Sequence, residues 1–257
     1  MPVPSRYTLC SRFEPAQPAL PCIRYLAEVT HLDGIVEAMY AGPQPLTAQA
    51  NGFFGLGIMG QLDTSRFDAI VERVKASGVA MVPTQILMDN YASDATGEEL
   101  TSGEEFAYWV PQQVAAWRKF KDDLLAQAAV PREQREAFLA LRRGALKSLY
   151  DAGVPFLLGA DAPQLWNVPG FSAHRELGSL VTAGLTPYQA LRTGTVDIAK
   201  FMGEEGTAGV VRPGARADLL LLDANPLESI GNSLRISGVM ANGRWIAREE
   251  RDAMLRA

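Results

Sequence analysis

The segment Val154–Pro163, which reads VPFLLGADAP, constrains the fold of this chain more than any other stretch. Its first five residues are apolar or small and follow one another without alternation, which is typical of a strand buried on both faces of a parallel sheet. Gly159 and Ala160 then allow a close approach of the backbone, and Asp161 is expected at the carboxyl end of the strand. In α/β barrels that end is the active-site face, and a carboxylate there is placed for metal binding or proton transfer.

Composition narrows the class of protein. The chain has 24 basic and 29 acidic residues, a net charge of −5, and its basic residues form no cluster. Nucleic acid and anionic membrane surfaces are therefore not expected partners. Cys10 and Cys22 have neither zinc-finger nor thioredoxin spacing, which favours reduced thiols in a cytosolic protein over a disulfide. We expect a cytoplasmic protein, because the sequence offers neither a membrane-spanning run nor a secretory signal.

From residue 23 onward the sequence alternates between expected strands and helices. Residues 1–22 carry five prolines and predict an irregular arm. Apolar residues at helical spacing, each set followed by glycine, predict helices over Thr64–Ser77 and from about Arg132 to Ala152. The predicted parallel strands are Ile23–Thr30, Pro45–Gln49, Val79–Pro83 and Val154–Gly159.

Two regions stand apart from this alternation. The long excursion Thr84–Val130 is rich in aromatic residues and is expected to form a lid or pocket wall. After residue 205, ADLLLLD and ISGVMANGRWI predict strands, with Asn242-Gly243 as a hairpin turn and a terminal helix from about Arg248. The predicted domains are an arm (1–22), a partial α/β barrel (23–205), strands of a small β-domain (206–247) and a terminal helix (248–257).

Several motifs fall in an order that carries a resemblance. A strand ending in Gly-x-Asp is followed by AGLTPYQALRTGT and then by PGARADLLLLDANPL. From about Gly34 to Trp245 the chain resembles the C-terminal part of metal-dependent amidohydrolases, closest to their imidazolonepropionase-like and prolidase-like branch. The resemblance implies the C-terminal half of a (β/α)8 barrel plus part of a small β-sandwich domain. It also implies hydrolysis of amide C–N bonds in a small molecule by water activated on a divalent metal, expected to be zinc.

The resemblance assigns roles to three residues at predicted strand ends. Asp161 is expected to bind the metal and to carry the proton of the attacking water. His31 is a candidate metal ligand, although the family motif GH-x-P-x-EVGLDGV places Tyr25 at the ligand position, so a solvent-exposed histidine at a helix start is the alternative. Gln49 stands in QANGF where the family has the histidine of HANGF; because an amide is a poor zinc ligand, we expect Gln49 to contact substrate.

Further candidates follow the Asp161 strand. His174, in the H-x-EL context of the family, and Asn167 are expected to contact substrate, with Trp166 as a possible pocket wall. A histidine packed at the helix start is an equal alternative for His174. Glu176 is expected to favour the start of its own helix through the helix dipole. Serine-based catalysis finds no support, since G-x-S-x-G is absent and no base is placed beside a serine.

Two functional hypotheses remain. The first is an amidohydrolase-type enzyme with Asp161 as ligand and base. The second is a truncated or metal-incompetent homologue that serves as a non-enzymatic binding or assembly module, because only Asp161 of the family's ligand set is unambiguous here. The isolated chain is accordingly expected to be inactive. Half a barrel would leave open sheet edges, which favours homo-oligomers.

Overall fold

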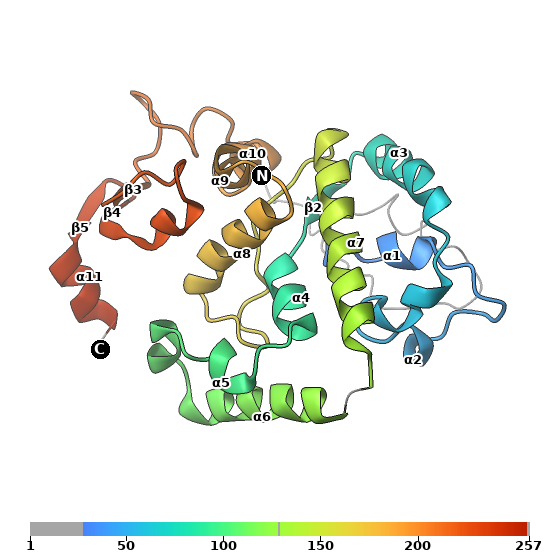
Figure 1. The fold of residues 1–257 in the computed structure, drawn as a ribbon. Coiled ribbons are helices and arrows are strands. Elements are labelled where there is room, and N and C mark those ends of the chain that lie inside the picture. The colour runs from blue at the N-terminus through green and yellow to red at the C-terminus, as the bar shows by residue number, and fades with distance from the viewer. Residues whose placement is uncertain (1–27, 128, 256–257) are drawn as a thin grey trace, which may run out of the picture. The chain divides into compact units, whose positions relative to one another are not determined.

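The computed structural model describes residues 28–127 and 129–255, and the chain forms two compact units (Figure 1). The first unit contains residues 28–83 and 130–156, and the second contains the rest of the described residues. Each unit is built from elements that are separated in the sequence. The arm (1–22), Tyr25, Cys10 and Cys22 lie outside the described residues.

A short parallel sheet forms the centre of the first unit. Strand β1 (Glu28–Thr30) pairs with β2 (Ala80–Val82), and Val29 lies opposite Met81. A parallel bridge joins Met81 to Phe156, and the Met81 amide donates to the Pro155 carbonyl at 2.8 Å. The prediction of parallel strands is therefore confirmed for 28–30 and 80–82, and the segment around Phe156 contributes a single bridge. The first part of the predicted strand 23–30 lies outside the described residues.

The predicted strand Pro45–Gln49 is wrong. A helical turn, α2 (Ala48–Asn51), begins there, and Gln49 lies exposed on it. The cause is local: the Thr47 side chain accepts a hydrogen bond from the Ala50 amide at 3.2 Å, which caps the turn. The apolar-looking run before Asn51 is thus too short to extend as a strand once Thr47 closes it.

Helices cover this sheet. Besides α1 (Ile35–Ala38), the unit has α3 (Phe67–Ser77), which buries Ile70, Val71 and Val74 as its spacing predicts and ends at Gly78 in the left-handed region. Helix α7 (Arg132–Asp151) packs against α3 and buries Phe138, Ala145 and Leu149. The remaining elements are the 3-10 helices η2 (Leu56–Gln61) and η3 (Thr64–Arg66).

The second unit is mainly helical. Its first part is the excursion, which folds into α4 (Gln85–Ala92), α5 (Gly97–Leu100), the 3-10 helix η4 (Glu104–Tyr108) and α6 (Pro111–Gln127). Helix α8 (Phe171–Thr182) packs against α4 (Figure 1). Then come α9 (Pro187–Thr193), which the Thr186–Gln189 capping box starts as predicted, and α10 (Val196–Phe201).

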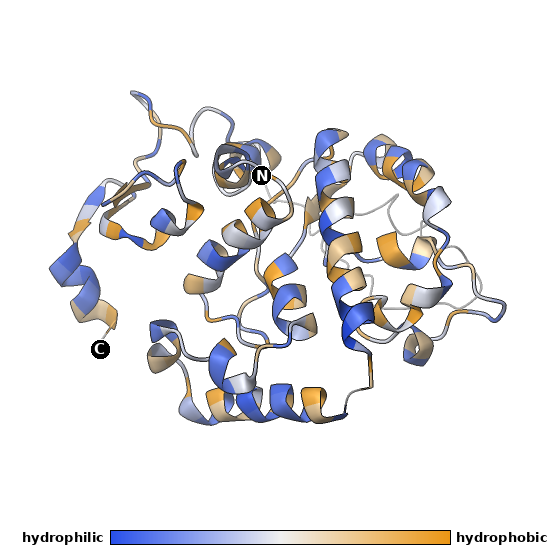
Figure 2. Cartoon of the chain, viewed as in Figure 1, coloured by the Kyte–Doolittle hydropathy of each residue, from blue (hydrophilic) through white to orange (hydrophobic). Residues whose placement is uncertain are grey.

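A three-stranded antiparallel sheet ends the second unit. It runs β3 (Leu219–Leu222), β4 (Ile236–Ala241) and β5 (Arg244–Ala247), with the 3-10 helix η5 (Ile230–Leu234) before β4 and helix α11 (Arg248–Leu255) after β5. Asn242 and Gly243 have φ of 48° and 79°, as a two-residue hairpin turn requires. Most of α11 is hydrophilic (Figure 2). The predicted limits of the small β-domain stay a prediction.

The architecture is a mixed α/β fold. The strands of the described residues form one two-stranded parallel sheet and one three-stranded antiparallel sheet, without a closed barrel in that part of the chain. A second sheet that would complete a sandwich is likewise not found within residues 28–127 and 129–255.

Candidate functional site

Asp161 lies exposed on a loop whose backbone is fixed on both sides. Before it, the Leu158 amide donates to the Thr193 carbonyl at 3.1 Å, and after it the Asn167 side-chain amide donates to the Ala160 carbonyl at 2.7 Å. Asp161 itself has φ 53°, in the left-handed region. Aspartate and asparagine enter this region more readily than most residues, which suits an acidic residue to the position. The loop therefore presents the Asp161 carboxylate from a defined backbone.

Asn167 and Trp166 are buried residues next to this loop, and Asn167 is hydrogen-bonded to it. Asn167 is fully buried, and its Oδ1 has no hydrogen-bond partner among the described residues, while its Nδ2 fixes Ala160. Trp166 is 1% exposed, and its Nε1 donates to the Trp117 carbonyl at 3.0 Å. The sequence predicts a substrate contact for Asn167 and a pocket wall or a core position for Trp166; the structure buries both side chains next to the Asp161 loop.

His174 contacts a serine that the sequence does not connect with it. The Nδ1 of His174 on α8 lies 3.0 Å from Oγ of Ser233 on η5. A base does therefore lie beside a serine, contrary to the expectation from the sequence. Ser233 is only 3% exposed, so its hydroxyl is not accessible to attack a substrate. The pair instead joins α8 to the segment that precedes β4.

Burial lowers the pKa of His174, so the folded protein favours the neutral ring. Below the ordinary histidine pKa the unfolded chain binds the proton more readily, and the free energy of unfolding should therefore fall as the pH drops from about 7 through about 6.5. Urea unfolding at pH 7.5 and 5.5 measures this loss. We expect it to be smaller in His174→Gln than in the wild type. An equal loss in both proteins would contradict the assignment.

Two buried charged side chains hold α4 at its two ends. Glu176 is fully buried on α8 and accepts hydrogen bonds from the amides of Gln85 and Ile86 at 3.0 and 2.7 Å. Lys121 of α6, also fully buried, donates to the carbonyls of Asn90, Tyr91 and Ser93 at 2.7–2.9 Å. A negative charge at the start of a helix and a positive charge at its end both interact favourably with the helix dipole and stabilise the helix. Glu176 thus caps α4 and not its own helix.

In the first unit, His31 is held by its backbone. His31 and Leu32 have φ of 57° and 58°, and both guanidinium nitrogens NH1 and NH2 of the buried Arg142 donate to the His31 carbonyl at 3.0 Å. The His31 ring lies 4.9 Å from the Phe54 ring, centroid to centroid, at 44°. The structure thus places the His31 ring next to an aromatic ring and the His31 carbonyl in contact with a buried arginine.

Carboxylates near His31 form a second polar group that sequence reasoning missed. Burial raises the pKa of Asp33 to about 7; the charge of Glu37 adds to this, and that of Arg142 opposes it. Glu37 in turn accepts from Nδ2 of Asn51 at 2.9 Å, and Asn51 Oδ1 has no partner among the described residues. A carboxyl that titrates near neutral pH can act as a general acid or base. The Asp33 side chain is nevertheless in contact with solvent, and hydration of its carboxylate favours the charged form and opposes the increase in pKa.

The described side chains do not gather into a metal site. Within residues 28–127 and 129–255, no group of three or more histidine, cysteine, aspartate or glutamate side chains could hold a metal ion. His31 and Gln49 belong to the first unit, whereas Asp161, Asn167 and His174 belong to the second. A catalytic zinc needs three protein ligands. The described side chains therefore do not fit a resident metal.

In the same part of the chain, no helix has both the length and the apolar character to cross a membrane.

Comparisons with known proteins identify the family. A model described as the amidohydrolase family matches residues 29–246. Bottromycin amidohydrolase is a similar solved structure, with a TM-score of 0.60 and 23% identity over 93% of this chain and 49% of that protein. An Xaa-Pro dipeptidase with bound methionine in its active site has a TM-score of 0.45, 20% identity and coverage of 70% and 37%. Ochratoxinase of A. niger has a TM-score of 0.49, 19% identity and coverage of 87% and 37%.

The chain spans about half the length of bottromycin amidohydrolase. Comparison with curated proteins gives no match. The family match runs from within β1 to within β5 and includes Asp161, Asn167 and His174. The chain belongs to the amidohydrolase family.

Proposed function

We propose that this chain carries the Asp161 side of the active site of a hydrolase that cleaves amide C–N bonds in small molecules. The observation that carries the proposal is the family match over residues 29–246, which includes an exposed aspartate on a fixed loop. The motifs that follow Asp161 favour the prolidase-like branch and hence a peptide-like or cyclic amide as substrate.

The chemistry assigned to Asp161 is proton transfer. Amide hydrolysis requires that the attacking water lose a proton and that the leaving nitrogen gain one. An exposed carboxylate on a fixed backbone can accept the first proton and return it to the amine. Asn167 supports this role through the Ala160 carbonyl. His174 and Gln49 remain proposed substrate contacts.

A divalent metal would supply activated water in such an enzyme. We propose zinc as that metal, held with donors from outside the described residues, because the side chains described in neither unit complete a site. The same holds for the fold: we propose that the chain is equivalent to the C-terminal half of a barrel with part of a β-sandwich. We also propose that the protein is a homo-oligomer, because half a barrel would leave open sheet edges, and that it is cytoplasmic.

The isolated chain is expected to hold zinc poorly. Loss of even an outer-shell partner of a metal ligand costs about 10–100-fold in affinity, and here whole ligands are not provided. Elemental analysis after dialysis should find well under one zinc per chain, and Asp161→Ala should not change that value. Near-stoichiometric zinc that disappears in Asp161→Ala would show that the chain has a ligand set of its own.

The hydrolase proposal is tested by amine release from a panel of aminoacyl-proline dipeptides and cyclic amides. The tagged chain is purified twice, once alone and once under non-denaturing conditions from its own cells. We expect turnover in the second preparation and none in the first. If neither preparation hydrolyses any amide with zinc, manganese or cobalt added, the hydrolase proposal fails and the non-enzymatic homologue becomes the better hypothesis.

A further inference from the structure

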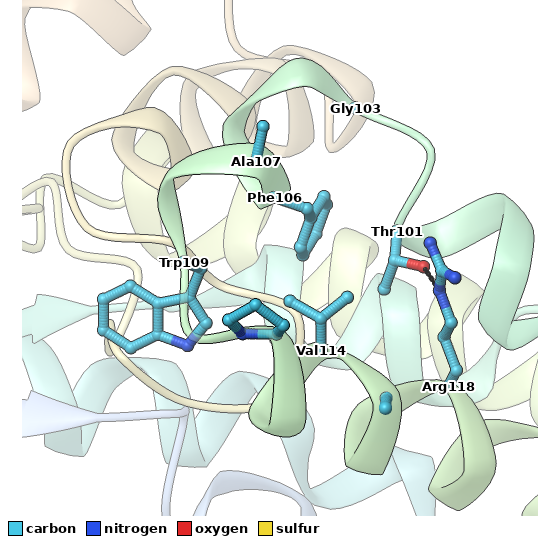
Figure 3. Close-up of a pocket in the computed structure, with 9 residues that line it drawn as sticks. Thr101, Gly103, Phe106, Ala107, Trp109, Val114 and Arg118 are labelled. Atoms are coloured by element: carbon cyan, nitrogen blue, oxygen red, sulfur yellow. Dashed lines mark hydrogen bonds between the residues drawn. The ribbon is translucent and has the colours of Figure 1, made fainter. Parts of the chain in front are cut away.

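A pocket of about 390 Å³ opens in the excursion of the second unit (Figure 3). It lies between the end of α5, the 3-10 helix η4 and the first turns of α6. Its volume falls in the lower part of the range of small-molecule sites, and its wall exposes apolar and polar surface in nearly equal amounts.

The apolar wall is made of aromatic rings held in place by their neighbours. The ring of Trp109 stacks on that of Trp117 at 6.2 Å and 9°, and the Phe106 ring meets Trp117 edge-on at 6.4 Å and 84°. Phe106 and Val114 are each only 7% exposed. A wall of this kind, rigid and flat, favours a planar apolar group over a flexible chain.

The polar end of the pocket is Arg118. Its Nε donates to Oγ1 of Thr101 at 2.5 Å (Figure 3). The Thr101 hydroxyl donates in turn to the Gly97 carbonyl at 2.8 Å. Thr101 is 3% exposed, so this anchor is buried. The NH1 group forms an ion pair with Glu98 at 3.1 Å, and Arg118 keeps further N–H donors for a ligand.

Glu98 decides which acceptor suits Arg118. The Glu98 carboxylate already pairs with the guanidinium, so it disfavours a second carboxylate from a ligand; because the Glu98 side chain is 74% exposed, water reduces the size of this repulsion. A neutral carbonyl oxygen can accept from Arg118 without that repulsion. The indole Nε1 of Trp109 is buried and has no partner among the described residues, so Arg118 is the donor that a ligand in the pocket can reach.

We propose that this pocket binds a neutral aromatic group that carries an amide or other carbonyl oxygen. The aromatic ring lies against Trp109 and Phe106, and the oxygen accepts from Arg118. The inference rests on the proposed function in one respect only: such a group would be the non-reacting part of an amide substrate. Binding itself does not depend on hydrolysis.

The test uses phenylacetamide as the probe and the indole N–H signals of the full chain, which has four tryptophans. We expect the Trp109 signal, assigned with Trp109→Phe, to move during a titration with a Kd of about 1 mM, as suits so small a ligand. The signal of Trp245 on β5 should stay in place. Ala115→Trp, which fills the pocket, should weaken binding at least about 10-fold. The neighbouring, non-lining Ala116→Trp on the same helix should not.

Glu98→Gln tests the argument from charge. It should strengthen binding of phenylacetate by about 2–5-fold, as expected for a solvent-exposed charge, and leave phenylacetamide unchanged, whereas Arg118→Gln should weaken phenylacetamide and the control Lys119→Gln should not. Absence of a Trp109 shift, equal binding by Ala115→Trp and Ala116→Trp, or a wild-type preference for phenylacetate would each overturn the proposal. A shift of Trp109 without any amide hydrolysis would leave this site standing and count against the proposed function alone.

Discussion

Asp161→Asn should reduce amide hydrolysis, measured on the protein purified under non-denaturing conditions from its own cells, by about 100-fold or more, the usual size of a lost general acid–base group. Asparagine enters the left-handed region as readily as aspartate, so the backbone at φ 53° and the hydrogen bond from Asn167 to Ala160 should both survive the change. The loss would then report on the carboxylate and not on the loop. Amine release at saturating substrate measures the effect.

The matched control is Asp151→Asn. Asp151 is an exposed carboxylate at the end of α7, paired with Lys147, and should leave turnover within about twofold of the wild type. Unfolding by urea checks that both variants fold. If Asp161→Asn keeps its turnover while folding normally, Asp161 is not the proton carrier and the proposed site is wrong.

Glu176→Ala should lower the free energy of unfolding by about 3 kcal/mol, because it leaves the amides of Gln85 and Ile86 buried without their acceptor. Glu176→Gln keeps one carbonyl oxygen and should cost less. Hydrogen exchange of the Gln85 and Ile86 amides should rise more than that of β4, since the lost contacts are at the start of α4.

Glu249→Ala is the control for this effect. Glu249 is an exposed glutamate in the first turn of α11, and its removal should change stability by no more than about 0.5 kcal/mol. Equal, small effects of the two substitutions would show that the buried carboxylate of Glu176 is not needed to hold α4.

Much of the fold could be predicted because its signals are local. The apolar spacing in α3, the Thr186–Gln189 capping box of α9 and the Asn242-Gly243 turn each depend on residues within a few positions of one another. The same kind of signal explains the failure at 45–49, where the Thr47 cap, also local, outweighs the strand pattern.

The candidate site could be predicted only where a motif names the residue. Asp161 follows from its motif, but the single bridge at Phe156 that stands in place of the predicted strand and the contacts around Asp161 do not. Glu176 reaches amides about ninety positions earlier in the chain, and His174 meets Ser233 fifty-nine positions later. No periodicity links residues so far apart, so the capping of α4 and the burial of Asn167 became visible only in the folded chain.

The division into two units has a consequence for how the chain folds during synthesis. Helix α7 belongs to the first unit but is made after the whole excursion, 84–129, which belongs to the second. The core around β1, β2 and α3 therefore stays incomplete on the ribosome until α7 emerges, and the excursion in turn waits for α8 to supply Glu176. A single truncation between residues 84 and 156 separates segments that pack together within a unit. Removal of the excursion would in turn leave the buried Glu176 carboxylate without the Gln85 and Ile86 amides, so a shortened form of the second unit must keep the excursion together with α8.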